Sequence, residues 1–453
     1  MKNHHKKPLK AIIPISIFLF IISCAPTLQY IQPQFPYPQN PEAYIQGRDF
    51  ESRLLSPHYQ AQLDSLFNQH LFHVWTAEIP DHSKKDAYWA IAFVQSKQGY
   101  GENKLPYTSV QLQKIIENAD SASYGQKVWL GMNVERTDLR ALPTEHPFYY
   151  HFDQAGEGFP FDYLQNSSLP VNTPVRVVNQ SRDKAWLLVE SHHAMGWVPT
   201  MQIVPVDSAI IRAWEKSQLI APVQEPVTLL DSLNHFVSQA KIGSVFPLID
   251  TTDTHWIVGV VVKCNQLKGE MIPAKVPKNQ AVRKPWPFTL AHAAGLAEQM
   301  IYELYGWGGY LSNRDCSAMI KDFYAPFGIW LPRHSKTQAS YFPDQIELKV
   351  FQNSQKEALI LKEGLPYLSL IYKPGHIMLF AGARGNRPVV FHNLWGLRTR
   401  PRFGREGRKI IGQAALTTLT PGKDLKTPAR KETLLDGVSR ITFVVHPDSV
   451  QLH

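Results

Sequence analysis

The spacing of hydrophobic residues changes several times along the chain, and each change predicts a different kind of element. Apolar residues recur at helical intervals over residues 60–72 and again over 110–116, and they predict two helices. Short β-type runs alternate with turn residues between 127 and 205, which is typical of a small antiparallel barrel. A weaker set from about 225 to 285 repeats the pattern of a tryptophan within a strand, so the two segments are candidates for a duplicated module. A tryptophan in a strand more often packs in a core than binds a ligand.

The final third begins with two predicted helices separated by a glycine-rich turn. Apolar residues at helical spacing run from Leu290 to Leu304, with Thr289 available as the N-cap. A second apolar stripe begins at Cys316, and Asp315 is a suitable cap for that helix. A helix N-terminus favours a thiolate over a thiol, so Cys316 is a candidate nucleophile. The alternative is that Cys316 is a small buried apolar residue, as most lone cysteines are.

Two histidines are candidate partners for this cysteine. Residues 375–380 and 389–394 predict neighbouring strands joined by a five-residue loop over 382–386. A hairpin centred on this loop would place His376 directly opposite His392, with Cβ atoms about 5 Å apart. One imidazole could then activate the thiol while the other orients it. Because the chain has 18 histidines, a chance pairing is the alternative.

The first 24 residues have the features of an export signal. Four lysines precede an apolar run over residues 11–22, and this run is too short to span a bilayer. Cys24 follows a small residue, a placement that resembles the lipobox of bacterial lipoproteins, and a plain signal peptide is the alternative. Without the signal the charge falls from +9 to +5, with 43 basic against 38 acidic residues, which weakens the case for nucleic acid binding. The proline-rich residues 24–50 predict an extended tether.

The motifs of the final third occur in an order that is more specific than any one of them. They read YGWGG, RDCSAMIKD, FGIWLPR, PGHIMLF and HNLWG. Over residues 287–425 they resemble the NlpC/P60 cysteine peptidases. The resemblance is strongest to the lipoprotein branch that carries two bacterial SH3-type domains after an N-terminal stabilising region, and a less specific likeness covers most of 50–285.

The resemblance implies a papain-like peptidase domain with a catalytic triad. In that family the matching residues make Cys316 the nucleophile, His376 the general base and His392 the orienting residue. The family cleaves the bond between γ-D-glutamate and the diamino acid of peptidoglycan stem peptides, and branches with an SH3-type domain beside the cleft favour fragments with a free N-terminal L-Ala. No metal or cofactor is implied.

The same resemblance assigns the substrate contacts. The ammonium of L-Ala would be bound by Asp315, and Ser317 and Tyr305 would be further substrate-binding residues. Two positions depart from the family pattern: Ala318 replaces a glycine after the nucleophile, and His334 replaces an asparagine. Neither departure removes a catalytic atom.

These observations combine into one expected organisation. We expect a multidomain α+β protein with a signal peptide (1–23), a tether (24–50), a mainly helical stabilising region (51–126), two small SH3-like β-barrels (127–205 and 206–286) and a papain-like peptidase domain (287–453). We expect a monomer, held in the cell envelope by a lipid on Cys24, that acts on peptidoglycan peptides and binds no nucleic acid.

Some questions remain open at the level of sequence. The basic segment 398–409 is either a solvated loop or a surface that attracts anionic wall peptides or lipid headgroups. The alternatives to a wall peptidase are a wall-binding scaffold whose peptidase domain is inactive, and an enzyme that uses the same thiol for acyl transfer or for another amide cleavage. Cys264, beside a valine-rich strand, is expected to be a buried packing residue.

Overall fold

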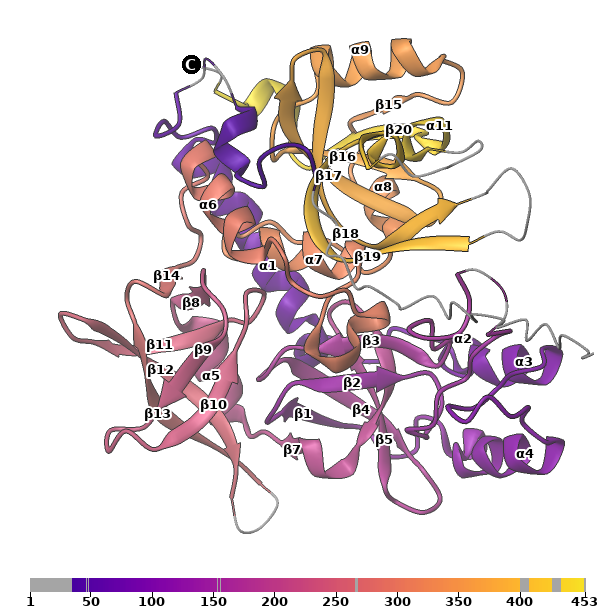
Figure 1. Ribbon diagram of the computed structural model, residues 1–453. Coiled ribbons are helices and arrows are strands. Elements are labelled where there is room, and N and C mark those ends of the chain that lie inside the picture. The colour runs from indigo at the N-terminus through magenta and orange to yellow at the C-terminus, as the bar shows by residue number, and fades with distance from the viewer. Residues whose placement is uncertain are drawn as a thin grey trace, which may run out of the picture. The chain divides into compact units, whose positions relative to one another are not determined.

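A computed structural model describes most of the chain after the N-terminal segment (Figure 1). The described residues are 35–451 without 46, 48, 153, 155, 265–267, 400–406 and 426–432. The predicted signal peptide, Cys24 and part of the predicted tether therefore lie outside the described residues. Within the described part, no helix combines the length and the apolar character that crossing a bilayer requires.

The first part of the described chain is helical. Its helices are α1 (Pro57–Thr76), α2 (Lys84–Ala87), α3 (Trp89–Ser96) and α4 (Ser109–Asn118). The Ser56 hydroxyl caps α1 by accepting a hydrogen bond from the Tyr59 N–H, and Pro57 occupies the first turn, where its missing N–H costs nothing. Both helices predicted from apolar spacing are confirmed, although each is longer than predicted.

A seven-stranded antiparallel sheet follows. Its strands are β1 (Trp129–Asn133), β2 (Thr137–Arg140), β3 (Gln165–Leu169), β4 (Pro174–Gln180), β5 (Trp186–Ser191), β6 (Met195–Pro199) and β7 (Ile203–Pro205), in the spatial order β3-β2-β6-β5-β4-β1-β7. Trp197 of β6 is fully buried in the core with Tyr88 of the helical region against it. The packing interpretation of this strand tryptophan is therefore correct.

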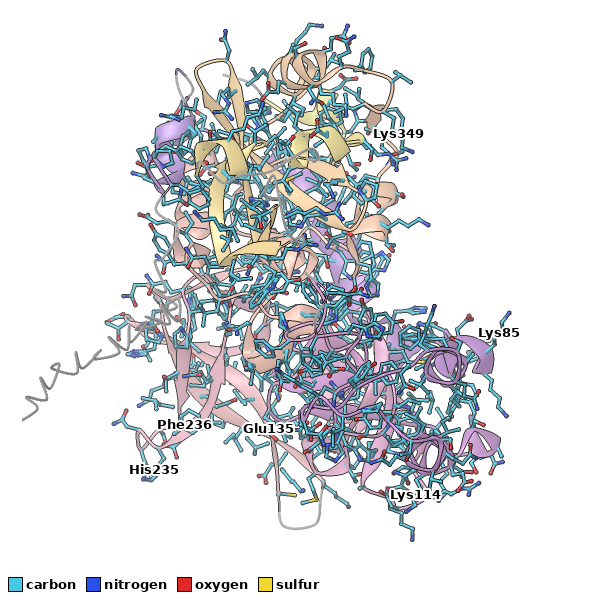
Figure 2. The ribbon with its side chains drawn as sticks, turned by 45° about the vertical axis from the view of Figure 1, so that its right-hand side comes forward. Lys85, Lys114, Glu135, His235, Phe236 and Lys349 are labelled. Atoms are coloured by element: carbon cyan, nitrogen blue, oxygen red, sulfur yellow. The ribbon has the colours of Figure 1, made fainter. Side chains whose placement is uncertain are left out.

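A second seven-stranded sheet is reached through α5 (Ser208–Lys216). Its strands are β8 (Leu219–Pro222), β9 (Val227–Leu230), β10 (Phe236–Ala240), β11 (Phe246–Thr251), β12 (His255–Lys263), β13 (Gly269–Pro277) and β14 (Ala281–Arg283), in the order β10-β9-β13-β12-β11-β8-β14. Strand for strand, this is the order of the first sheet, which supports duplication of one module. His235 and Phe236 lie at the outer end of one hairpin (Figure 2), where Phe236 is 67% exposed. Cys264 is only partly buried, so the expectation that it is a buried packing residue is wrong.

The C-terminal domain is built on a six-stranded antiparallel sheet. Its strands are β15 (Gln345–Glu347), β16 (Ser369–Lys373), β17 (His376–Arg384), β18 (Arg387–Thr399), β19 (Gly407–Thr418) and β20 (Arg440–Phe443), in the order β15-β20-β16-β17-β18-β19. Its helices are α6 (Leu290–Met300), α7 (Cys316–Tyr324), α8 (Ser335–Tyr341), α9 (Asn353–Glu363), α10 (Pro421–Asp424) and α11 (Leu434–Gly437).

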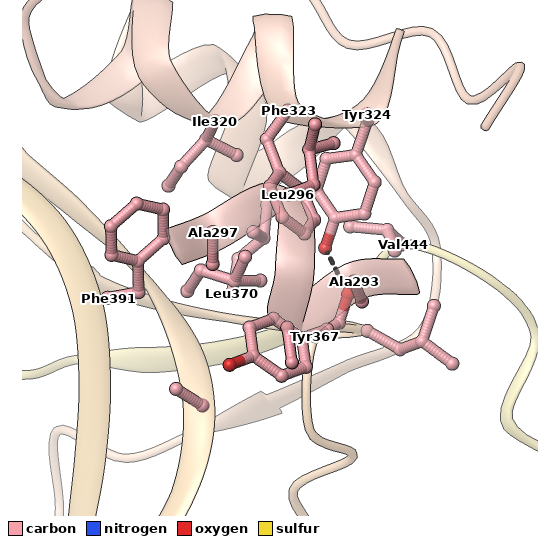
Figure 3. Close-up of a cluster of buried hydrophobic side chains, with 14 of the residues drawn as sticks. Ala293, Leu296, Ala297, Ile320, Phe323, Tyr324, Tyr367, Leu370, Phe391 and Val444 are labelled. Carbon is pink, nitrogen blue, oxygen red and sulfur yellow. Dashed lines mark hydrogen bonds between the residues drawn. The ribbon is translucent and has the colours of Figure 1, made fainter. Parts of the chain in front are cut away.

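Alternate residues of the sheet feed two separate cores. Ile377 and Leu379 of β17 pack with α6 and α7, whereas Met378 and Phe380 pack with α9 and α11. All nine residues of α7 are buried, so the helix that begins at Cys316 lies inside the domain. Figure 3 shows the core that contains α6 and α7, in which the Tyr324 hydroxyl donates a hydrogen bond of 2.7 Å to the backbone oxygen of Tyr367.

The first helix of this domain is shorter than predicted. Thr289 caps α6 as expected, with its hydroxyl accepting from the His292 N–H, but the helix ends at Met300. Ile301 already has extended backbone dihedrals, and Leu304 is 60% exposed. The apolar spacing beyond Met300 therefore does not represent a helical face. With mixed helix and sheet, two SH3-sized sheets and a helical N-terminal region, the expected fold class is confirmed.

Candidate active site

Cys316 opens α7 at the wall of a large cleft. The Asp315 side chain caps the helix by accepting a hydrogen bond of 2.9 Å from the Ala318 N–H, as predicted. The cleft has a volume of about 770 Å³, and Cys316 lines it together with Asp315, Ser317, Tyr305 and His376. Five of the six residues singled out from the sequence in this domain therefore share one cavity, while His392 lies fully buried behind it.

The thiol of Cys316 is held in its neutral form. Burial, followed by the negative charge of the neighbouring Asp315 carboxylate, raises its pKa to about 12. The backbone N–H groups of Ile377 and Ser317 and the Arg333 guanidinium act in the opposite direction but do not outweigh burial. The expectation that the helix N-terminus favours a resting thiolate is wrong here, because the desolvation of a buried sulfur is the larger effect.

The two histidines contact each other, but not in the predicted register. Leu379 pairs with Phe391, and the hairpin turn contains only two residues between Arg384 and Arg387. The predicted five-residue loop is wrong, and His376 and His392 are offset by two residues instead of lying directly opposite. An even offset keeps both on one face, and the His376 Nε2 lies 2.7 Å from the His392 Nδ1.

The ring of His376 is neutral and turned toward the buried histidine. Burial, followed by the positive charge of Lys373, lowers the pKa of His376 to about 4. Its Nε2 is occupied by His392, and among the described residues no hydrogen bond involves its Nδ1. His376 therefore keeps one ring nitrogen available to the cleft that Cys316 lines.

Asp315 has a partner that the sequence did not reveal. Arg333 donates to both carboxylate oxygens, at 2.9 Å to Oδ1 and 2.5 Å to Oδ2. The Ser317 hydroxyl, the Ala318 N–H and the Gly308 N–H donate to the same carboxylate. Although burial alone would raise the pKa of Asp315, the Arg333 charge and these hydrogen bonds lower it to about 2.

Arg333 also connects the site to the first sheet. Its Nε donates to the Ser167 hydroxyl of β3 at 3.1 Å. Two further contacts join the same strand to the glycine-rich turn: the Gln165 side-chain amide donates to the Gly308 oxygen at 3.1 Å, and a Cβ added at Gly308 would lie 2.4 Å from the Gln165 backbone oxygen. Gly308 has φ of +59°, so this turn needs glycine both for its dihedrals and for the close approach.

The second sheet domain holds the residue two positions before Cys316. Arg314 donates to both oxygens of Glu225, at 2.6 and 2.8 Å, and its Nε donates to Asp322 of α7 at 2.7 Å. Glu303 accepts a further hydrogen bond from the same guanidinium. Since Arg314 is only 4% exposed, this is a buried charge network that fixes the start of α7 against the second sheet domain.

One wall of the cleft comes from outside the C-terminal domain. Phe161, Tyr163 and Gln165 of the first sheet domain line it, and so does Trp89 of the helical region. The ring of Phe161 lies 5.2 Å from that of Trp307. Sequence reasoning missed these residues, because nothing in the local pattern indicates which aromatic side chains meet across domains.

The basic segment also contributes to the lining of the cleft. Arg398 and Arg408 line the cleft with Lys373 and Lys423, and Arg398 pairs with Arg408 across β18 and β19. Residues 400–406 lie outside the described residues. Arg398 and Arg408, near the described ends of the segment, therefore contribute to the cleft.

Family profiles match four successive parts of the chain. They are the N-terminal stabilising domain of NlpC/P60 proteins (13–124), an SH3 domain of the SH3b1 type (147–199), an SH3 domain of the SH3b2 type (207–253) and the NlpC/P60 family itself (303–384). The last match contains Cys316 and His376.

One solved structure is similar to this chain over nearly its full length. An NlpC/P60 endopeptidase from Photobacterium damselae subsp. piscicida is 25% identical, with a TM-score of 0.80 over 91% of this chain and 98% of that one. An NlpC/P60 family protein from Bacillus cereus is 14% identical, with a TM-score of 0.44 over 67% of this chain and 99% of that one. A search of curated protein sequences gave no significant match. The order of the four domains, and the likeness over nearly the full length of the first of these structures, place the chain in the NlpC/P60 family of cysteine peptidases.

Proposed function

We propose that the protein hydrolyses the bond between γ-D-glutamate and the diamino acid in peptidoglycan stem peptides. Cys316 is the nucleophile, His376 the general base and His392 the orienting residue. The observation that carries the proposal is the 2.7 Å contact between His376 and the buried His392, which leaves one nitrogen of His376 available in the cleft that Cys316 lines.

The reaction starts from a neutral thiol and a neutral imidazole. His376 takes the thiol proton as the Cys316 sulfur attacks the carbonyl carbon of the γ-glutamyl bond, and it returns this proton to the departing amine of the diamino acid. A water molecule, deprotonated by the same imidazole, then hydrolyses the thioester and releases the γ-glutamyl carboxylate. Because the resting thiol has a raised pKa, proton transfer to His376 accompanies the attack instead of preceding it.

Charge in the cleft favours an anionic peptide. Lys373, Lys423, Arg398 and Arg408 line it, whereas the carboxylate of Asp315 is already balanced by Arg333. A stem peptide carries the α-carboxylate of D-glutamate and the carboxylates of its diamino acid. These groups would be attracted to the basic part of the lining.

Turnover fragments with a free N-terminal L-Ala are the proposed substrates. The wall formed by Phe161, Tyr163 and Gln165 of the first sheet domain meets the lining beside Asp315 and would oppose a stem still linked to glycan. Asp315 would bind the L-Ala ammonium as part of a pair with Arg333, since its oxygens already accept five hydrogen bonds. Tyr305 and Ser317 would complete the substrate contacts.

The proposed location is the bacterial cell envelope. An export signal ending at Cys24, with lipid attached to this cysteine, would hold a monomeric enzyme at a membrane facing the wall. Peptidoglycan peptides are the proposed partners, and nucleic acid is not. The alternative function is a wall-binding scaffold without catalytic activity.

Defined muropeptides test the proposal. The wild-type protein and its Cys316→Ala variant are incubated with free L-Ala-γ-D-Glu-diamino acid peptides, with the same peptides linked to N-acetylmuramic acid, and with intact sacculi, and the products are identified by mass spectrometry. We expect L-Ala-D-Glu and the released diamino acid from the free peptides with wild type only. Equal cleavage of free and glycan-linked stems would contradict the preference for turnover fragments, and no cleavage of any substrate would favour the scaffold.

A further inference from the structure

A third polar side chain lies behind the two histidines. The His392 Nε2 is 2.9 Å from the Thr417 hydroxyl oxygen, and that hydroxyl is 2.8 Å from the backbone oxygen of Thr418. Both His392 and Thr417 are fully buried. Neither needs to contact substrate, so any effect on catalysis would act through His376.

The direction of each hydrogen bond in this series follows from its last acceptor, the backbone oxygen of Thr418. A carbonyl oxygen has no hydrogen, so the single proton of the Thr417 hydroxyl must point to the Thr418 oxygen. The Thr417 oxygen must then accept from the His392 Nε2–H, which leaves the His392 Nδ1 without a proton. That nitrogen must accept from the His376 Nε2–H, so the remaining nitrogen of His376, Nδ1, carries the lone pair.

We propose that Thr417 is a positioning residue that fixes the proton of His376 on Nε2, so that its Nδ1 can accept the proton of the Cys316 thiol. The inference rests on the proposed function for the role of His376 as base. It adds a residue that sets which nitrogen acts. In the opposite tautomer His376 would present an N–H to the thiol and could not accept its proton.

The sheet geometry makes this arrangement specific. His392 pairs with Ala415, and Thr417 is two residues further along β19, on the same face. His376 is offset from His392 by the same two residues on β17. The three side chains therefore form a diagonal line across three adjacent strands. Each hydrogen bond joins residues that are diagonal neighbours and not directly opposite each other.

Substitutions at Thr417 separate the hydroxyl from the volume of the side chain. Thr417→Val keeps the shape and removes the hydroxyl, and Thr417→Ser keeps the hydroxyl. Thr442→Val is the matched control, because Thr442 is also fully buried in this sheet and donates to a backbone oxygen, that of Ala339, away from the histidines. The assay is the rate at which iodoacetamide alkylates Cys316 at neutral pH, measured in a Cys264→Ala background so that only one of these two thiols reacts. This rate shows how well His376 accepts the thiol proton, and it needs no wall peptide.

We expect Thr417→Val to lower the alkylation rate about tenfold, the effect of losing one ordinary buried hydrogen bond on the tautomer equilibrium. Thr417→Ser and Thr442→Val should stay within about twofold of wild type on the same scale. Nitrogen NMR of 15N-histidine-labelled protein, assigned with His376→Gln and His392→Gln, should give wild-type His376 a protonated Nε2 and a bare Nδ1.

A wild-type spectrum with a protonated Nδ1 on His376 would overturn the proposal, even if Thr417→Val failed to fold. So would equal slowing by Thr417→Val and Thr442→Val, or a Thr417→Ser variant as slow as the valine. If the alkylation rates and spectra agree with expectation but no muropeptide is cleaved, the proposed function fails and the assignment of Thr417 stands. If muropeptides are cleaved and Thr417→Val changes neither rate nor tautomer, only the assignment of Thr417 fails.

Discussion

The pair of Asp315 and Arg333 gives a sharp prediction about stability at the active site. Asp315→Asn keeps the shape of the side chain but removes its charge and turns one acceptor oxygen into a donor. The new amide hydrogens would face the N–H groups of Gly308 or Arg333, which also donate. Arg333, only 4% exposed, would then be a buried cation without a carboxylate.

The expected magnitude follows from this burial. Breaking a buried ion pair by removing one partner costs about 3 to 5 kcal/mol of unfolding free energy, far more than an exposed pair of the same length. For a domain of this size, each kcal/mol shifts the melting temperature by about 2 to 4 °C, so Asp315→Asn should lower it by roughly 6 to 20 °C. The double variant Asp315→Asn/Arg333→Gln removes both charges and should lose less than the sum of the two single variants.

Thermal unfolding followed by circular dichroism and tryptophan fluorescence measures these shifts. Lys349→Gln is a suitable control, because Lys349 projects from the surface of the C-terminal domain (Figure 2) and should leave the melting temperature unchanged. A shift below about 2 °C for Asp315→Asn, or additive effects of the two single substitutions, would refute the reasoning that this pair is buried and mutually dependent.

The remaining predictions concern catalysis, pH and location. Cys316→Ala should abolish peptide hydrolysis with the fold intact, and hydrolysis within tenfold of wild type would exclude covalent catalysis by this residue. His376→Ala should lower kcat/KM nearly as much, and His392→Ala should lower it less. Because the pKa of His376 is lowered to about 4, the acid limb of the kcat/KM profile should lie well below pH 6.5, and an acid limb at 6.5 or above would contradict this prediction. The unfolded chain binds a proton on this histidine at a higher pH than the folded protein does, so protein stability should decrease as pH falls from about 6.5 toward 4. Cys24→Ser should leave an unprocessed precursor in membrane fractions, and ordinary soluble export of the wild type would defeat the lipoprotein proposal.

The sequence predicted elements well where local spacing decides them. The helix capped by Asp315 and the strands around Trp197 were both expected, because capping and period-two alternation act within a few residues. The pairing of His376 with His392 was expected on the correct face with the wrong register. The register at the turn alone would put the two rings on opposite faces. A β-bulge between Phe380 and Gly382, which the sequence pattern does not indicate, brings them back to one face.

The features that the sequence did not predict depend on contacts between distant segments. Arg333 meets Asp315 from 18 residues away, and Glu225 reaches Arg314 from another domain. The thiol of Cys316 was expected to be acidic because helix position is visible in a sequence, whereas the burial that raises its pKa is not. Trp89 was missed as a cleft residue because it reaches the cleft from the helical region, far away in the sequence.

Catalysis through the thiol of Cys316 is the central claim, and partial alkylation tests it most directly. A Cys264→Ala protein is treated with increasing iodoacetamide, and the fraction of Cys316 modified is measured by peptide mass spectrometry in the same samples as the hydrolysis of L-Ala-γ-D-Glu-diamino acid peptide. We predict that activity falls in one-to-one proportion to the modified fraction and that the free peptide protects Cys316 from alkylation. Protein with fully alkylated Cys316 that still cleaves the peptide would contradict the account.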